Sequence, residues 1–578
     1  MASNRNLVAM RPMNGSSSHS KSSASATARD AAPSPGPPPD ENVIGSWLCD
    51  AGPYQRYIEA LSGSNPGLKK ADPNNKTGPL KKGNAVVVLL DSPSTGQPDY
   101  THEERFVSAS QLRKHFDGTP HDHNRRRIYL MEGLAPDYVA AIGGHFFMEP
   151  TFFQRQERTC VWSNDFTPVS DALAQPSLLN PKRSFHLQYC ELRQFNKALE
   201  NRYYFCERTR RHVGMTAPRH KEESTTGILR RKISWWCRET GKGGWDVVVL
   251  CDPQLLHLAP DPMEVVNGQL RPIDGVRDTL KNNPFQDGYV QFIPPKTFDS
   301  PPPASALDHM LDNIQNMAHP HTSMLEDLLY YYKRHSNLLT PKEWGAPEKS
   351  AIFLQKIVAA HYLQLVDYIK VMLPSLELKL TTAWVEEQDQ WKSLQTISRR
   401  CGNFRDDIED NLLSLGYALD GRMDAPLKMT TDSWKDCERD LQYVYFRLKI
   451  LKERADNLTT SMTGLASIAG NRQNLEEAKR VKRLNLLALL FIPLAYTSSL
   501  FSMQDNYAPN KKNFWIYWVS AIGAVAFTSI VTFVLDRALD DEANWTLAPI
   551  KYLKFWGSEG KPGPVKRKAT GLYDHVKR

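Results

Sequence analysis

Two uncharged apolar segments close to the C-terminal end constrain this fold more than any other feature of the sequence. Residues 484–503 and 515–535 contain no Asp, Glu, Lys or Arg. A helix of about 20 residues crosses the ~30 Å hydrocarbon layer of a bilayer, and a buried core helix is rarely apolar all round over that length. The sequence therefore predicts two transmembrane helices, 484–503 and 514–535, joined by an outer loop of residues 504–513.

Polar and aromatic residues in these segments fit a membrane setting. Pro493 is tolerated inside the first helix if neighbouring helices or water satisfy the carbonyl that it frees. Hydroxyl residues near the end of this helix either line a water-filled path or hydrogen-bond between helices, the second being commoner; they are Thr497, Ser498, Ser499 and Ser502. An aromatic belt typical of a membrane interface begins the second segment: Phe514, Trp515, Tyr517 and Trp518.

The distribution of basic residues predicts the orientation. Four of them precede the first helix, namely Lys479, Arg480, Lys482 and Arg483. The outer loop has Lys511 and Lys512, and residues 536–578 form a basic tail. Because Lys and Arg concentrate on the cytosolic side, we expect both termini in the cytosol. The plasma membrane is expected rather than the mitochondrial inner membrane, since the N-terminus is more typical of a tail than of a presequence.

The rest of the chain predicts a large cytosolic body. Residues 1–43 form a Ser/Pro-rich tail typical of disorder. Apolar and β-branched runs, interrupted by short helical patterns, predict an α/β (α+β) domain over residues 44–295. Helical spacing then predicts a helical layer over residues 296–433, with breaks at Pro341, Pro374 and Gly421.

A heptad seam predicts a long stalk helix over residues 434–483. Apolar residues recur there in steps of three and four: Trp434, Cys437, Leu441, Val444, Leu448, Leu451, Ala455, Leu458, Met462, Leu465 and Ala469. Such a seam belongs either to an ordinary long helix in a bundle or to a self-associating stalk. Its length favours self-association.

Several function classes find no support in the sequence. A net charge of +8 spread over 578 residues is too dilute for a nucleic-acid-binding protein. The eight cysteines show no C-x-x-C pairing, which favours reduced, mostly buried thiols. The glycine-rich run at Gly241 precedes a strand and is therefore no phosphate loop. We find no catalytic constellation and predict that the protein is not an enzyme and has no resident cofactor.

Two kinds of residue were weighed as metal ligands. The His-x-His runs at His121 and His319 lie in polar segments, and surface histidines are the simpler interpretation. Asp406, Glu409 and Asp410 form either a cation-sensing site between subunits or, more commonly, a solvated helix face. No metal site is certain from the sequence.

From the stalk onward the chain resembles the CorA family of divalent-cation transporters. The resemblance rests on residues 471–503, with "FIPL" at Phe491 and an aromatic-x-Met ending. It implies a homopentamer whose first transmembrane helices line a central pore. The stripe expected to face that pore has helical spacing, and its alternative is packing against the second helix; it consists of Val481, Leu484, Ala488, Ile492, Ala495, Ser499 and Ser502.

The family signature, aromatic-Gly-Met-Asn, is altered in this chain. It appears as Phe501, Ser502, Met503 and Gln504, followed by Asp505. Serine loses the freedom of glycine at positive φ, while glutamine keeps an amide oxygen on a longer side chain. Hydrated magnesium holds its water tightly, so the size of such a ring matters. The acid Asp505 lies in a loop that Lys511 and Lys512 make net basic.

Two functions follow from these observations. The resemblance implies a membrane channel or transporter for a divalent cation, magnesium first, with the lipid bilayer and further copies of the chain as partners. The altered signature instead favours a non-conducting, membrane-anchored scaffold or sensor. The amide of Gln504 and the carboxylate of Asp505 can still hold a hydrated cation, so we expect transport.

Overall fold

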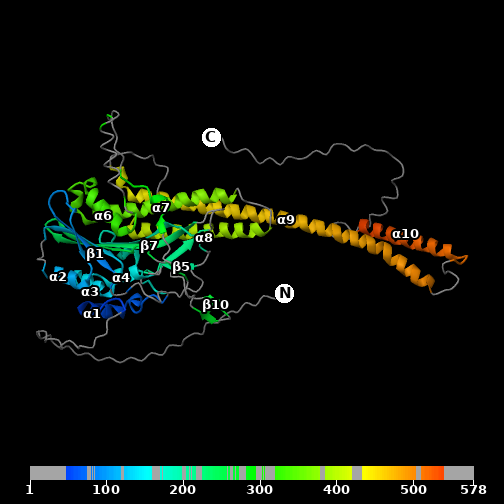
Figure 1. The fold of residues 1–578 in the computed structure, drawn as a ribbon, viewed down its shortest axis with the longest axis horizontal. Helices are drawn as coiled ribbons and strands as arrows, with labels where there is room; N and C mark the ends of the chain where they lie inside the picture. The colour runs from blue at the N-terminus through cyan, green and yellow to red at the C-terminus, as the bar shows by residue number, and fades with distance from the viewer. Residues whose placement is uncertain are drawn as a thin grey trace, which may run out of the picture.

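A mixed sheet between two helical layers forms the body of the protein, and one very long helix leaves it (Figure 1). The computed structural model describes residues 47–538 apart from internal gaps. The longer gaps are 74–79, 159–168, 217–223, 272–281, 294–302, 306–318, 378–383, 420–431 and 503–509. The predicted N-terminal tail and most of the basic C-terminal tail lie outside the described residues.

The sheet has ten strands in the order β2-β1-β3-β8-β7-β6-β5-β9, with β4 paired to β7 and β12. They are β1 (Val86–Pro93), β2 (Glu103–Phe106), β3 (Arg125–Glu132), β4 (Ser184–Phe195), β5 (Tyr203–Cys206), β6 (His212–Met215), β7 (Thr225–Gly241), β8 (Gly244–Cys251), β9 (Leu258–Pro260) and β12 (Asn282–Pro284). Strands β3 and β8 are parallel, and the other pairs are antiparallel. Strands β10 (Glu264–Val266) and β11 (Gln269–Arg271) form a separate hairpin. The predicted α/β (α+β) class is confirmed.

Alternating side chains divide the apolar core between the two faces of the sheet. In β1, Val87 and Leu89 pack on one face, and Val88 and Leu90 on the other, as the twofold repeat of a strand requires. The first face is covered by α1 (Pro53–Ser62), α2 (Ala109–Gly118), α3 (Pro136–Phe146) and α4 (Pro150–Glu157). Helix α4 begins at Pro150, a position in the first turn where proline is tolerated.

The second face carries the long helices. They are α6 (Met324–Arg334), α7 (Pro347–Glu377), α8 (Trp384–Leu415) and α9 (Cys437–Ser502). Their buried residues share one core with the sheet, so the predicted helical layer is continuous with the α/β domain. The predicted break at Pro374 is wrong. Proline stands in the last turn of α7, where its missing N–H removes a single hydrogen bond.

The heptad seam is buried inside the chain. Helix α9 packs against α7 and α8, and six seam residues from Cys437 to Ala455, with Met462, are buried there. The seam changes character beyond Met462, where the Leu465 side chain is 44% exposed. The expectation that this seam associates with other copies of the chain is therefore wrong for residues 437–462, which pack within the chain. A heptad pattern defines an apolar face but does not define which helix covers it.

Buried arginines tie the strands together. Glu191 in β4 accepts hydrogen bonds from Arg193 and Arg231. Arg211 and Asp252 form a second buried ion pair. Arg230 in β7 donates to Asp407 of α8 across 2.6 Å and so links the sheet to the long helices. Apart from Glu191 with Arg193, two residues away on the same strand, these pairs join residues at least 40 positions apart and had no signal in the sequence.

Candidate functional site: the apolar helix hairpin

Helix α9 continues from the body that contains the sheet into the first apolar segment without interruption. It has 66 residues, and α10 (Phe514–Ala538) folds back along its far end (Figure 1). Both helices contain a stretch long and apolar enough to cross a membrane, and those stretches are only 11% and 6% buried within the chain. Apolar helices left uncovered to this extent require a nonaqueous surrounding. The predicted stalk and first transmembrane helix are thus one element.

A few buried residues with small or cyclic side chains lie where α9 and α10 are in contact. Pro493 and Thr497 are buried in the apolar part of α9, and Ala521 is fully buried in α10. Near the joint, the rings of Phe501 and Tyr517 meet edge to face at 5.9 Å. Trp515 and Trp518 are exposed beside this contact, as the predicted interfacial belt requires.

The hydroxyl groups of α9 satisfy carbonyls of their own helix. Thr497 donates to the carbonyls of Pro493 and Leu494, each at 3.0 Å. Ser502 donates to the carbonyl of Ser499 at 3.0 Å. The expectation that these two hydroxyls bond between helices is therefore wrong, because back-bonding to the preceding turn is available locally.

The predicted pore-facing stripe does not pack against α10. All seven residues of the stripe are exposed, with Leu484 64% and Ile492 67% exposed. The contact with α10 instead uses the neighbouring face, where Pro493 and Thr497 lie. The stripe is thus available to another copy of the chain or to lipid, as are most other apolar side chains of this stretch.

Charged residues bracket the apolar part of α9. Lys479, Arg480, Lys482 and Arg483 are exposed at its near end, and Lys511 and Lys512 are exposed just before α10. From Arg483 to Ser502 the helix rises about 28 Å, which matches the ~30 Å hydrocarbon layer. Of the altered signature, Phe501 and Ser502 end α9. Met503, Gln504 and Asp505 lie outside the described residues.

The acidic run of α8 divides into one buried and three outward-facing groups. Asp407 is the buried partner of Arg230. Asp406 pairs with Arg405 at 2.8 Å, and Glu409 and Asp410 lie partly or fully exposed beside it. This arrangement agrees with a solvated helix face. The glycine-rich run at Gly241 is the turn between β7 and β8, with three successive residues at positive φ.

His319 contradicts the surface interpretation of the His-x-His runs. Its side chain is 1% exposed and lies 3.6 Å from Asp327 of α6. Burial lowers the pKa of His319 to about 3 and raises that of Asp327 to about 8. The segment is polar in sequence but is covered by Tyr289, whose ring packs edge to face on His319 at 5.4 Å. His121 lies outside the described residues, and His123 is exposed.

A sheet domain that extends one helix into an apolar hairpin defines a membrane-anchored protein with a large polar body. Residues 341–537, which span α7 to α10, match the family model of the CorA-like Mg2+ transporter proteins. This match shows that the C-terminal region, α7 to α10, is similar to the CorA-like proteins.

Solved structures and curated sequences were compared as well. The complete structure of the CorA magnesium transporter from Methanocaldococcus jannaschii covers 77% of this chain and 96% of its own, at 9% identity and a TM-score of 0.32. The full-length CmaX protein covers 78% of this chain and 97% of its own, at 11% identity and a TM-score of 0.29. TM-scores of this size support no conclusion about this chain. No curated protein sequence matches it.

Proposed function

We propose that the protein is a CorA-like transporter or channel that passes a divalent cation, magnesium first, across a membrane. The observation that carries this proposal is the family match over residues 341–537, which ends with the apolar hairpin. An exposed apolar stretch at both helices supports it, since such surfaces are covered by lipid or by other copies of the same chain.

Self-association is part of the proposal. A pore needs several first helices around one axis, and the stripe from Val481 to Ser502 is exposed on α9. We propose the pentamer that the resemblance implies. We also propose that the sheet domain and both termini lie in the cytosol and that the membrane is the plasma membrane. The basic residues that precede the apolar stretch of α9 support this orientation.

A second function rests on the signature itself. Ser502 stands where the family has glycine, and Gln504 where it has asparagine. A ring of longer amides changes the space for a hydrated ion, which binds through its water shell. A non-conducting scaffold or sensor is the function that this observation favours.

Cation flux separates the two functions. The natural chain and the double variant Ser502→Gly with Gln504→Asn are each reconstituted in liposomes, and magnesium entry is followed with an internal indicator dye. We expect flux through the natural chain, comparable in the double variant. Flux confined to the double variant would establish the scaffold and overturn transport. A matched control, Ser520→Gly, alters a hydroxyl of α10 that donates to its own helix and should leave flux unchanged.

A further inference from the structure

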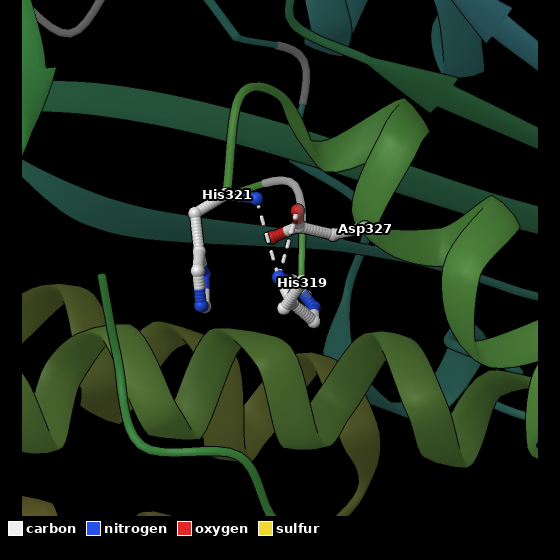
Figure 2. Close-up of side chains that lie close together, drawn as sticks. All are labelled: His319, His321 and Asp327. Atoms are coloured by element: carbon white, nitrogen blue, oxygen red, sulfur yellow. Dashed lines mark hydrogen bonds and ion pairs between the residues drawn. The ribbon is translucent and has the colours of Figure 1, made fainter. Parts of the chain in front are cut away.

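A compact group of nitrogen and oxygen ligands lies in the cytosolic body, far along the chain from the apolar hairpin. His319, His321 and Asp327 each offer one ligand atom, and the three atoms lie within 4.8 Å of one another. Figure 2 shows the side chains of His319 and Asp327 facing each other, with the ring of His321 beside them. The two histidines precede α6, and Asp327 belongs to its first turns.

The hydrogen bonds around His319 fix the position of its proton. The backbone N–H of His321 donates to Nδ1 of His319 at 3.2 Å, so Nδ1 carries a lone pair and Nε2 carries the proton. Nε2 lies 3.2 Å from the Tyr289 hydroxyl, which in turn donates to Oδ2 of Asp327 at 3.0 Å. Two hydrogen bonds, from His319 to Tyr289 and from Tyr289 to Asp327, therefore satisfy the polar atoms on one side of the group.

The other side of the group brings Oδ1 of Asp327 to 3.6 Å from Nδ1 of His319. A cation bound there would replace the proton that the raised pKa of Asp327 favours, and would take the Nδ1 lone pair that now accepts from the His321 N–H. Among the residues that the structure describes, Oδ1 of Asp327 and Nδ1 of His321 are buried and have no hydrogen-bond partner. Leaving a buried polar atom without a partner costs about 1–3 kcal/mol, and a cation bound in place of any proton on these two atoms would satisfy them together.

Backbone conformation holds the group in place. His321 adopts a φ of 44°, in the left-handed region that few side chains occupy. The facing loop contains Gln286, Asp287 and Gly288, also at positive φ, and the ring of His321 fills the space that a Cβ at Gly288 would need. Strain of this kind persists where the surrounding structure enforces it and clusters at functional sites.

A buried ion-pair network borders the group. Glu191 accepts from Arg193 and Arg231, and Arg193 also donates to the carbonyl of Thr322 at 2.8 Å, next to the histidine loop. Asp327 becomes a second carboxylate beside these two guanidinium groups only when it is ionised, as a bound cation would require. His361 completes the surroundings, with its ring 4.7 Å from that of Tyr289.

We propose that His319, His321 and Asp327 bind a divalent cation of the zinc class, separate from the transport path. Two imidazoles and one carboxylate suit zinc, cobalt or nickel, whereas magnesium selects oxygen ligands. Ligand atoms of a tetrahedral zinc site lie about 3.3–3.6 Å apart, from bond lengths of about 2.0–2.2 Å. The 3.6 Å between His319 and Asp327 already meets that spacing. Three protein ligands leave the fourth position for water.

Metal binding to the full-length protein in detergent tests the site. After treatment with a chelator, the protein is titrated with Co2+, whose visible absorption reports tetrahedral nitrogen and oxygen ligation, and the Co2+ is then displaced with Zn2+. We expect one such site per chain. Asp327→Asn and His319→Gln should each weaken it by more than about 100-fold, beyond the loss caused by removing an outer-shell partner. His102→Gln, a control at an exposed histidine of the same domain, should bind as the natural chain does.

Two results would overturn the proposal. One is a natural chain without a tetrahedral cobalt spectrum, and the other is unchanged affinity in Asp327→Asn. Thermal unfolding of the metal-free variants shows whether they fold, and Asp327→Asn preserves the shape and the acceptor for Tyr289. Binding is measured without ion flux, so the outcome is independent of whether the hairpin conducts.

Discussion

Glu191 shows how single buried charges hold the sheet to itself. It lies between Arg193 of its own strand and Arg231 of β7. Burial disfavours its charged form, but the two guanidinium groups outweigh burial and lower its pKa to about 2. A carboxylate in this position stabilises two arginines that would otherwise be buried without a counter-charge.

The stability of the protein should therefore fall in acid through Glu191. The folded-state pKa lies below the unfolded value, so its contribution is complete above about pH 4.5 and is lost as the pH falls toward 2. The loss amounts to about 3 kcal/mol. Glu191→Gln should lower the free energy of unfolding at pH 7 by about 3–5 kcal/mol and flatten this acid slope.

Chemical denaturation at a series of pH values measures both effects. Glu377→Gln is the matched control, because the partner pair of Glu377 and Arg454 is 46% and 44% exposed and such pairs contribute about 0–1 kcal/mol. Identical acid slopes in the natural chain and Glu191→Gln would refute the assignment.

The burial of individual polar residues was the structural property that the sequence predicted least well. The polar residues around His319 indicated a surface loop, yet Tyr289, thirty positions earlier, covers it. The same holds for Arg230 and Asp407, which are separated by 177 residues. No local pattern encodes such contacts, because they depend on how distant elements pack.

At the scale of elements, periodicity predicted the long helices and strands and missed some of the short strands. The apolar runs of β1, β3 and β8 and the helical spacing of α6 to α10 were all recognised. Strands β2 and β6 have four residues each and alternate too briefly to be read. The heptad seam located α9 correctly but not its partners, since α7 and α8 cover it as far as Met462.

The division of the seam at Met462 leads to a direct comparison of two leucines. Leu448 is fully buried, whereas Leu465 is 44% exposed. Leu448→Ala should destabilise the body of the protein by about 2–5 kcal/mol. Leu465→Ala should cost less than about 1 kcal/mol when the chain is measured as a monomer. Thermal unfolding followed by tryptophan fluorescence compares them. Equal losses in a monomeric preparation would contradict the intrachain packing of α9.

At the scale of the whole molecule, the exposed stripe of α9 carries the assembly hypothesis. Position 488 lies on that stripe, and position 490 is turned about 200° away from it at ~100° per residue. If copies meet around the stripe, Ala488→Cys should form disulfide-linked dimers under mild oxidation in the membrane. Leu490→Cys, which is also exposed, should form few.

Non-reducing gels measure the disulfide-linked dimers, and the natural cysteines should contribute little background. Cysteines among the described residues are all buried, and the untreated natural chain corrects for Cys160, which lies outside them. Equal cross-linking at positions 488 and 490 would contradict the hypothesis that copies of α9 meet along the stripe. Native mass spectrometry of the same preparation then counts the copies.

The continuity of α9 gives the protein a mechanical property. One end of the helix is fixed among α7, α8 and the sheet, and the other reaches the far side of the apolar hairpin. Beyond Met462 about 40 residues, or roughly 60 Å, stand clear of the body. A rod of that length works as a lever, so each degree of tilt at its base displaces its tip by about 1 Å. In the proposed channel, a rearrangement too small to disturb the packing of the body would then be enough to change the distance between the Ser502 positions of neighbouring copies.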